Sequence, residues 1–283
     1  MILVTGGTGF LGSALVRELR KSNEVRVFAK NGGTVQDDVA DYSSVYNAMK
    51  GADTVIHLVA EKDHFAPYKR HYETTVIGTS NVMKAAAKRG IKVVYMSSAV
   101  AKNENQTNYV RAKAEAEKIA KSYWGKIAVP IVRASLIYDG STIKKLKMLS
   151  FLPFPHKRQK IHLSYKDSVV QALIGAVKYG KSEIYEVGDA KPILLTDLIR
   201  EIARPRPVLW VPPQTIWILI ALAYPIEWLS RLLRIRPLIT PTYVRYLFED
   251  RHLETKKAIK TLRYKPVGTL ETVRKIKCGD TEI

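Results

Sequence analysis

The sequence has a single cysteine, Cys278, which lies in a polar stretch near the end of the chain. One cysteine cannot form a disulfide within the chain, and it cannot build a cysteine-based metal site. The carboxylates Asp37 and Asp38 have no cluster of histidines beside them, so we expect no metal site of another kind. Because the first residues already read as a core strand, we expect no secretory signal, and a reducing, cytoplasmic location follows.

Motifs for nucleic-acid binding are also missing from this strongly basic chain. The formal net charge is +20 at pH 7, and a basic surface attracts nucleic acid, anionic lipid or other polyanions. The lysines and arginines are spread along the chain and no recognition motif accompanies them, so nucleic acid is not expected as a partner. A basic surface of the thermophile kind explains the charge equally well.

The order of strand-like and helix-like segments predicts the fold class. The sequence is 46% hydrophobic and 25% charged over 283 residues, which suits one large globular domain or a domain with an attached lobe. Beyond an apolar strand at the start, the expected strands are 25–28, 54–59, 92–96 and 127–133. The expected helices are 10–19, 43–50, 76–88, 109–122 and 168–178. Repeated βα units predict an α/β fold with a doubly wound parallel sheet.

A glycine series follows the first strand directly. Gly6, Gly9 and Gly12 stand three residues apart in the stretch ILVTGGTGFLG, and a helix-like segment begins at once. In such a loop the first glycine permits a tight turn, the second lets the backbone approach a pyrophosphate, and the third lets the helix pack against the strand. The helix N-terminus presents free N–H groups to phosphate oxygens. The strand and helix on either side therefore predict a dinucleotide-binding site.

The character of the chain changes after about residue 191, although no repeat or low-complexity linker marks a boundary. Prolines gather there among helical, aromatic-rich stretches, at Pro205, Pro207, Pro212, Pro213, Pro225, Pro237 and Pro241. We predict a dinucleotide-binding domain over residues 1–180 and a smaller, mostly helical substrate lobe over residues 181–283. Such a lobe is expected to cover the carboxyl edge of the sheet, where ligands bind in this class of fold.

A tyrosine and a lysine four residues apart carry the candidate chemistry. Tyr109 and Lys113 fall on one face of an expected helix. A lysine ammonium beside a tyrosine phenol makes that phenol a usable acid or base, although its ordinary pKa is about 10. Ser98, at the carboxyl end of the preceding strand, has a hydroxyl that can bond a substrate oxygen. Ser97 is the alternative if the loop is shifted by one residue.

Together these motifs resemble the extended short-chain dehydrogenase/reductase family, which is Rossmann-like. The resemblance is carried by TGGTGFLG, HLVA (57–60), VVYMSSAV (93–100) and YVRAK (109–113). It continues in DVAD (38–41), in Gly78, Thr79 and Asn81, in the strand end 132–138 and in 167–169. The chain departs from the family at Thr75, usually Asn, at Ala112, usually Ser, and at Ala134, usually Pro.

The resemblance implies a role for each matching residue. Tyr109 would be the general acid/base, Lys113 would lower its pKa and hold the nicotinamide ribose, and Ser98 would orient the substrate oxygen. The residues expected to contact the cofactor are Gly6, Thr8, Gly9, Phe10, Leu11, Gly12, Lys30, Asp38, Val39, Leu58, Ala60, Tyr109, Lys113, Ala134 and Leu136. The family also implies a homodimer that pairs the helices 76–88 and 109–122.

The residue that closes the second strand bears on which dinucleotide is bound. An acidic residue there selects NAD by holding the adenosine ribose hydroxyls, whereas a basic residue accommodates the extra phosphate of NADP. This strand ends in Lys30, and no carboxylate follows before Asp37. The sequence therefore favours NADP over NAD.

The class of substrate is open to three interpretations. The chain resembles most the branch of 3β-hydroxysteroid dehydrogenases, dihydroflavonol reductases and hopanoid-associated epimerase-like proteins, which implies net oxidoreduction of a rather apolar hydroxyl or ketone. A nucleotide-sugar epimerase or dehydratase with transient hydride transfer is the first alternative, although residues 158–162 match its diphosphate-binding element poorly. A non-catalytic dinucleotide-binding or membrane-surface protein is the second.

Residues 207–226 carry no charge, and 216–223 are strongly apolar. This stretch is too short and too rich in flanking proline for a membrane span, which needs about 20 residues. Tryptophans and arginines near it suit a helix in the interface of an anionic membrane, namely Trp210, Trp217, Trp228, Arg231, Arg234 and Arg236; residues 143–160 add Lys144, Lys145, Lys147 and the apolar 151–154. The apolar residues suit equally well the roof of a substrate pocket. Both interpretations make an apolar substrate more plausible than a free sugar.

Histidines supply little further chemistry. His57 lies inside an expected strand and is more plausibly structural than catalytic. His64, Phe65 and Tyr68 follow the same strand and suit either the mouth of a substrate pocket or an exposed loop.

Overall fold

The computed structural model describes residues 1–102, 107–150, 154–156, 158–233, 235, 237, 240–241, 244 and 252–278, apart from the side chains of Leu149, Pro155 and Arg231. The chain forms two compact units. The first comprises Met1–Ser135, Lys166–Val187 and Glu254–Lys265, and the second comprises Leu136–Tyr165, Gly188–Leu253 and Pro266–Ile283.

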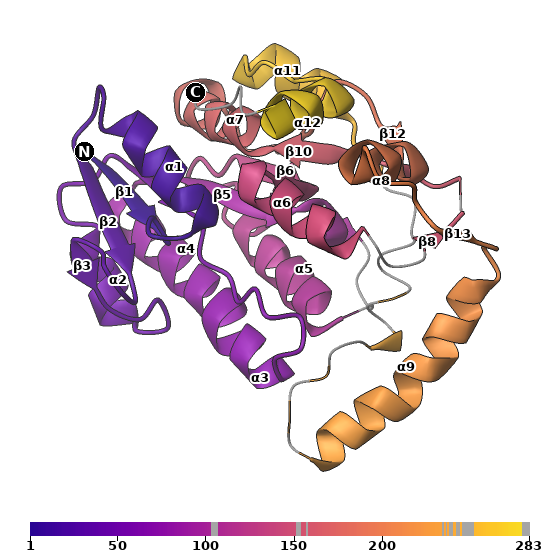
Figure 1. Cartoon of the computed structure of the whole chain (residues 1–283). Helices are drawn as coiled ribbons and strands as arrows, with labels where there is room; N and C mark the ends of the chain where they lie inside the picture. The colour runs from indigo at the N-terminus through magenta and orange to yellow at the C-terminus, as the bar shows by residue number, and fades with distance from the viewer. Residues whose placement is uncertain are drawn as a thin grey trace. The chain divides into compact units, whose positions relative to one another are not determined.

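The first unit contains a seven-stranded parallel sheet (Figure 1). Its strand order is β11-β6-β5-β4-β1-β2-β3. The strands are β1 (Ile2–Thr5), β2 (Val25–Ala29), β3 (Val35–Gln36), β4 (Thr54–His57), β5 (Lys92–Ser98), β6 (Ile131–Ala134) and β11 (Ile184–Val187). The central strands are buried on both faces, since β1 and β4 have no exposed residue, as is typical of parallel sheets. The predicted doubly wound α/β fold is confirmed.

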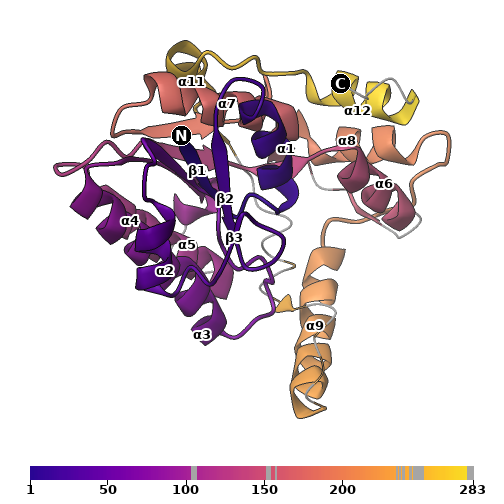
Figure 2. The ribbon, with the colours of Figure 1, turned by 90° about the vertical axis from the view of Figure 1, so that its left-hand side faces the viewer.

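Helices cover both faces of this sheet (Figures 1 and 2). One face carries α2 (Tyr42–Ala48), α4 (Gly78–Arg89) and α5 (Asn108–Lys121), which pack in sequence on one another. The other carries α1 (Phe10–Leu19), α7 (Lys166–Tyr179) and α11 (Thr255–Leu262). Local signals set the ends: Asp41 Oδ1 accepts from Ser43 N at 2.8 Å, Thr107 Oγ1 accepts from Val110 N at 3.1 Å, and Gly90 ends α4 with φ +68°.

Several predicted segments differ from the observed ones in length. The helix expected over 76–88 is the last part of a longer helical segment. In this segment α3 (Tyr68–His71) and a π-helical turn (Tyr72–Ile77) directly precede α4. Inside this turn the buried Thr75 Oγ1 accepts a hydrogen bond from Glu61 N at 3.0 Å, which fastens the loop after β4. The strands expected over 54–59 and 127–133 are shorter, ending at His57 and beginning at Ile131.

The strand order places a topological switch beside β1. The chain passes from β1 outward to β2 and β3 on one side, and then through β4, β5, β6 and β11 on the other. In open parallel sheets, ligands bind outside the carboxyl ends of the strands at this point. The loops after β1 and β4 are therefore the expected edges of a site.

The second unit is mostly helical. Its helices are α6 (Gly140–Leu149), α8 (Leu195–Ala203), α9 (Thr215–Leu232) and α12 (Thr269–Cys278). Its strands are short and lie in three two-stranded sheets, formed by β7 (Leu136–Tyr138) with β10 (Leu163–Tyr165), β9 (Lys160–Ile161) with β12 (Ile193–Leu194), and β8 (Phe154–Pro155) with β13 (Trp210–Val211). A core around Tyr138, Leu198 and Val273 joins α6, α8 and α12.

The two units do not follow the single boundary expected after residue 180. The first unit includes β11, which pairs with β6 in the register Ile184 to Ile131, and α11, which packs on α7. The second unit includes residues 136–165, which precede that boundary. In the described part of the chain, no helix is long and apolar enough to cross a membrane.

Candidate cofactor and catalytic site

The glycine loop lies between β1 and α1 and has the geometry of a phosphate cradle. Gly6 has φ +75°, a conformation that residues with a side chain rarely adopt. A side chain at Gly12 would collide with the carbonyl oxygen of Gly6 and the backbone of Gly7, so α1 packs closely on the loop. A Cβ at Gly6 would lie 3.2 Å from Val59 N, which shows that the glycine loop touches the loop after β4.

Lys62, which the sequence did not single out, reaches over this loop. Its ammonium lies 3.4 Å from the position that a Cβ on Gly9 would occupy, and the residue is exposed. Gly9 is the glycine whose missing side chain leaves room for a pyrophosphate. The sequence did contain a signal for this contact. It has a lysine at the switch point, five residues after His57, the last residue of β4. The loop residues thus suit a dinucleotide, with free backbone space and a cation at the same place.

His57 joins the strands beneath the loop. Its Nδ1 lies 2.6 Å from Thr5 Oγ1, and its Nε2 lies 3.1 Å from Thr79 Oγ1. Burial, with a smaller contribution from the charge of Lys113, lowers the pKa of His57 to about 3. The imidazole is therefore neutral at physiological pH and bonded on both sides, which agrees with the expected structural role.

The two serines at the end of β5 have different surroundings. Ser97 is buried, and its Oγ donates to Glu117 Oε2 at 2.7 Å. Ser98 is half-buried, and its Oγ donates only a long bond of 3.5 Å to the carbonyl oxygen of Ala134. A carboxylate engages Ser97, so Ser98 is the better placed of the two to bond a ligand.

Lys113 extends from α5 to the same strand. Its Nζ donates to the carbonyl oxygen of Met96 at 2.7 Å and lies 3.3 Å from the hydroxyl of Tyr95. Only 3% of this lysine is exposed, and burial lowers its pKa to about 8. The structure thus brings the ammonium of Lys113 to β5 two residues before Ser98.

Tyr109 lies one turn before Lys113 on α5 and is half-buried. Its ring packs against the imidazole of His64, with centroids 4.6 Å apart, and more loosely against His71 at 6.3 Å. His71 is held in turn, because its Nε2 lies 2.9 Å from the carbonyl oxygen of Asp63. His64, from the loop after β4, and His71, from α3, therefore both contact the ring of Tyr109, which the sequence did not indicate.

The residues expected at the adenosine end lie around β2. Lys30 Nζ bonds Asp38 Oδ2 at 3.1 Å, and 78% of the lysine side chain is exposed. The pKa of Asp38 is lowered, chiefly by the hydrogen bond from the Ala40 N–H. Val39 is buried against Gly78. Lys30 thus shares its charge with a carboxylate, which the sequence-based argument for NADP did not include.

A cavity of about 490 Å³ opens beside the outer side of the glycine loop. It is lined by Gly7, Thr8, Ser13, Val16, Arg17, Arg20, Val27, Gly32 and Thr34. Two exposed arginines, Arg17 on α1 and Arg20 just after it, make this cavity basic, and Thr8 connects it to the loop.

The other residues predicted to contact the cofactor lie partly in the first unit and partly in the second. Leu58 and Ala60 follow β4 and are partly exposed, Leu11 and Ala134 are buried, and the ring of Phe10 is 38% exposed. All of these lie in the first unit. Leu136 is 47% exposed and begins β7 in the second unit.

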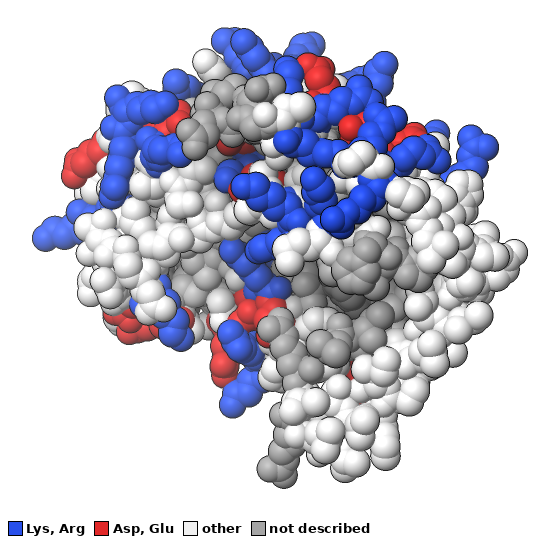
Figure 3. Space-filling view, viewed as in Figure 1, with Lys and Arg blue, Asp and Glu red and all other residues white. Residues whose placement is uncertain are grey.

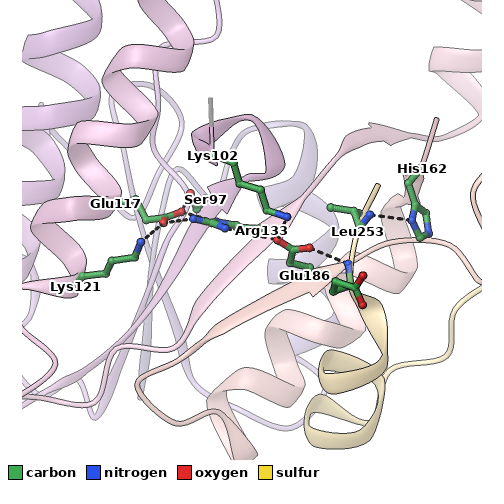
Figure 4. Close-up of polar contacts among 9 residues, drawn as sticks. Ser97, Lys102, Glu117, Lys121, Arg133, His162, Glu186 and Leu253 are labelled. Carbon is green, nitrogen blue, oxygen red and sulfur yellow. Dashed lines mark hydrogen bonds and ion pairs between the residues drawn. The ribbon is translucent and has the colours of Figure 1, made fainter. Parts of the chain in front are cut away.

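A buried ion network supports the strand ends that carry Ser98 (Figure 4). Arg133 on β6 donates from Nε to Glu117 Oε2 at 2.8 Å and lies 3.5 Å from Glu186. Two lysines also pair with these carboxylates. Lys121 Nζ lies 2.8 Å from Glu117, and Lys102 Nζ lies 2.6 Å from Glu186. The pKa of Glu117 is lowered to about 2, because its bonds to Arg133, Lys121 and Ser97 outweigh the opposing effect of burial.

The sequence is similar to a known family and to known proteins over parts of its length. Residues 2–138 match the family described as NAD dependent epimerase/dehydratase. A 2-alkyl-3-oxoalkanoate reductase of Stenotrophomonas maltophilia is 37% identical over 108 residues, 34% of this chain and 33% of the reductase. An N-acetyl-alpha-D-glucosaminyl-diphospho-ditrans,octacis-undecaprenol 4-epimerase of Escherichia coli O157:H7 is 24% identical over 234 residues, 71% of each chain. The match thus spans a third of the reductase's length.

Solved structures share the fold over nearly the whole chain. A UDP-glucose 4-epimerase of Thermotoga maritima superposes with a TM-score of 0.75 at 18% identity, covering 99% of both chains. A UDP-glucuronic acid 4-epimerase of Bacillus cereus, solved with NAD, gives a TM-score of 0.69 at 16% identity and the same coverage.

Proposed function

We propose that this chain, whose residues 2–138 match the NAD dependent epimerase/dehydratase family, is an enzyme that transfers hydride at a hydroxyl or ketone carbon of an apolar substrate. The observation that supports this proposal is the approach of Lys113 to β5, where its Nζ reaches Met96 O at 2.7 Å, two residues before Ser98. Ser98 is half-buried, and Tyr109 lies one turn before Lys113 on α5.

An NAD(P) dinucleotide, when bound, supplies or accepts the hydride at its nicotinamide ring. The glycine loop and Lys62 would hold its phosphates, and Lys113 its nicotinamide ribose. Ser98 would bond the substrate oxygen and orient it toward the phenol of Tyr109. Tyr109 then gives a proton to that oxygen during reduction or takes one during oxidation, while the buried ammonium of Lys113 favours the phenolate.

The apolar substrate is supported by the second unit and by the relatives' names. Residues 207–226 are uncharged, and several large hydrophobic side chains of this stretch are exposed. One relative is named for an oxoalkanoate with an alkyl group, and another for a sugar carried on undecaprenol. A ketone or alcohol attached to a hydrocarbon chain is the substrate class that fits both.

Net reduction can be separated from epimerisation with labelled cofactor. Reduced cofactor deuterated at C4 is supplied with a long-chain 3-oxoalkanoate, oxidised cofactor is supplied with UDP-glucose, and the products are analysed by mass spectrometry. We expect deuterium in the hydroxy product of the oxoalkanoate and an equal loss of reduced cofactor. Conversion of UDP-glucose without net change in the cofactor would instead favour the epimerase. If neither cofactor binds, both enzymatic interpretations are wrong.

We propose NADP(H) as the preferred cofactor. Lys30 ends β2, and the cavity lined by Arg17 and Arg20 offers two further cations next to Thr8. The pairing of Lys30 with Asp38 at 3.1 Å works against a large preference, because the carboxylate repels an added phosphate. Calorimetric titration of the parent with NADPH and with NADH measures this preference.

Replacing Lys62 with Met is expected to weaken binding of NADH and NADPH to the same degree, by about tenfold, because one charge-assisted contact to a shared pyrophosphate is lost. Calorimetric titration of both cofactors measures this. Nicotinamide mononucleotide, which has no pyrophosphate, should bind both proteins alike. Lys69→Met is the matched control, since this exposed lysine on α3 pairs only weakly with Glu73, at 3.9 Å. Equal affinities of the Lys62 variant and the parent would exclude the contact.

A further inference from the structure

The helix α9 in the second unit has an apolar surface far larger than it buries. It packs through one narrow face, where Ile216, Ile220 and Ala223 meet Val244. The large hydrophobic side chains of its other faces are exposed, among them Trp217 (68%), Trp228 (66%), Leu232 (63%), Ile218 (59%), Leu222 (56%), Tyr224 (56%) and Leu229 (48%). Figures 1 and 2 both show α9 standing apart from α6, α8 and α12.

The exposed side chains form a continuous arc around the helix. At about 100° per residue they cover roughly 220° of its circumference, from Tyr224 through Trp228 and Leu229 to Leu219. Every exposed side chain that the structure describes between 217 and 233 is apolar or aromatic. In Figure 3 the outer surface over α9 is accordingly white. Such a patch exceeds what soluble monomers ordinarily expose.

The width of this arc favours a lipid surface over a second copy of the chain. A partner helix covers one stripe of a helix, whereas a helix lying in a membrane interface is surrounded by lipid on all but its protein-facing side. The content of the arc agrees, because Trp217, Tyr224 and Trp228 are residues that favour the boundary between headgroups and acyl chains. Among the described residues no helix, α9 included, is long and apolar enough to cross the bilayer.

The unit that contains α9 also exposes positive charge. Arg204 and Arg206 precede α9 in the sequence and are exposed, and α6 exposes Lys144, Lys145 and Lys147. In the sequence Arg231, Arg234 and Arg236 follow the apolar stretch; Arg234 and Arg236, like residues 151–153, lie outside the described residues. With a net charge of +20, the chain is complementary to the anionic headgroups of a bilayer rather than to a neutral apolar partner.

We propose that α9 docks this protein on anionic membranes, with its exposed arc in the boundary between headgroups and acyl chains. This placement does not depend on which reaction the first unit performs. It gives the enzyme access to molecules that are dissolved in the membrane rather than in water.

The test compares two double variants of the full chain by co-sedimentation with vesicles. The vesicles are phosphatidylcholine alone or phosphatidylcholine with about 30% phosphatidylglycerol, a content at which basic proteins bind measurably. Leu222→Glu with Leu229→Glu places two carboxylates at the centre of the arc and keeps Trp217 and Trp228 as fluorescent reporters. Tyr72→Glu with Tyr179→Glu is the control, because it adds the same two charges at sites that are 42% exposed in the first unit.

We expect the parent and the control to pellet with the anionic vesicles, with a blue shift of tryptophan emission. The α9 variant should lose about a hundredfold in partition coefficient, since two leucines would no longer leave water. Cofactor binding by each variant, measured in parallel, checks that the first unit is folded. Absence of the parent from anionic pellets would overturn the proposal, and so would equal pelleting of the two variants. A dimer that the α9 variant abolishes, without binding to vesicles, would assign the arc to a second copy instead.

Discussion

Tyr109→Phe is expected to reduce turnover by about 10²- to 10⁴-fold while the affinity for the dinucleotide stays within a factor of about two, because general acid–base catalysis contributes that much to such a step. The ring of Tyr109 packs on His64 with a centroid distance of 4.6 Å, and phenylalanine keeps that contact. Only the hydroxyl that moves the proton is lost. Steady-state kinetics and calorimetric titration of the cofactor give the two quantities.

The controls for this result separate chemistry from packing. Tyr72→Phe removes the hydroxyl of an exposed tyrosine and should leave turnover unchanged. Ser98→Ala should reduce turnover, whereas Ser97→Ala should mainly reduce stability, because Ser97 donates to Glu117 at 2.7 Å. If Tyr109→Phe turned over at the parent rate, the protein would not use this tyrosine, and the non-catalytic interpretation would gain support.

Glu117→Gln is expected to destabilise the first unit by about 3–5 kcal/mol at neutral pH, because it removes one partner of a buried ion pair and leaves the guanidinium of Arg133 without its nearest carboxylate. Glu117 is 2% exposed and accepts hydrogen bonds from Ser97 and Arg133. Its replacement unpairs charges inside the sheet. Thermal denaturation followed by circular dichroism measures the difference.

The pH dependence of this difference has a definite sign. The pKa of Glu117 is lowered to about 2 in the folded protein from an ordinary 4.5, so its contribution to the free energy of unfolding is complete above pH 4.5. As pH falls from 4.5 toward 2 the unfolded chain takes up the proton first, and this contribution is lost. The stability of Glu117→Gln should therefore approach that of the parent in this range.

Glu271→Gln serves as the surface counterpart. Glu271 pairs with Lys275 at 2.8 Å, but its side chain is 69% exposed. Exposed pairs contribute little to stability, so this variant should have the same unfolding temperature as the parent at pH 7. A loss of stability as large as that of Glu117→Gln would mean that the buried network stabilises the protein no more than an exposed ion pair does.

The parts of the site that lie on regular elements could be predicted from the sequence. Gly6, Gly9 and Gly12 lie between a strand and a helix whose patterns are strong, and the helix observed over Phe10–Leu19 has the bounds that the sequence predicts. The spacing of Tyr109 and Lys113 follows from helical geometry alone. In these cases a local pattern decides the structure, and a short stretch of residues contains that pattern.

The parts that depend on contacts between distant segments could not be predicted. Lys62 lies over Gly9 because of the path of the loop after β4, and that path depends on Thr75, thirteen residues later, which holds Glu61 N. The pairing of Lys30 with Asp38 is likewise a contact across a turn. The choice between Ser97 and Ser98 required the position of Glu117 on α5. Such contacts leave no periodic signal in the sequence.

The first unit is built from three separate stretches of the chain. This matters for any experiment that divides the protein into fragments. A fragment that ends at residue 180 would lack β11, the strand that covers the outer edge of β6, and α11, which packs on α7. β6 would then be an open edge strand, with its N–H and carbonyl groups free to pair with other chains. The sheet and its helical cover are therefore complete only once residue 265 has been synthesised, and a cofactor-binding half cut at residue 180 would be prone to aggregate.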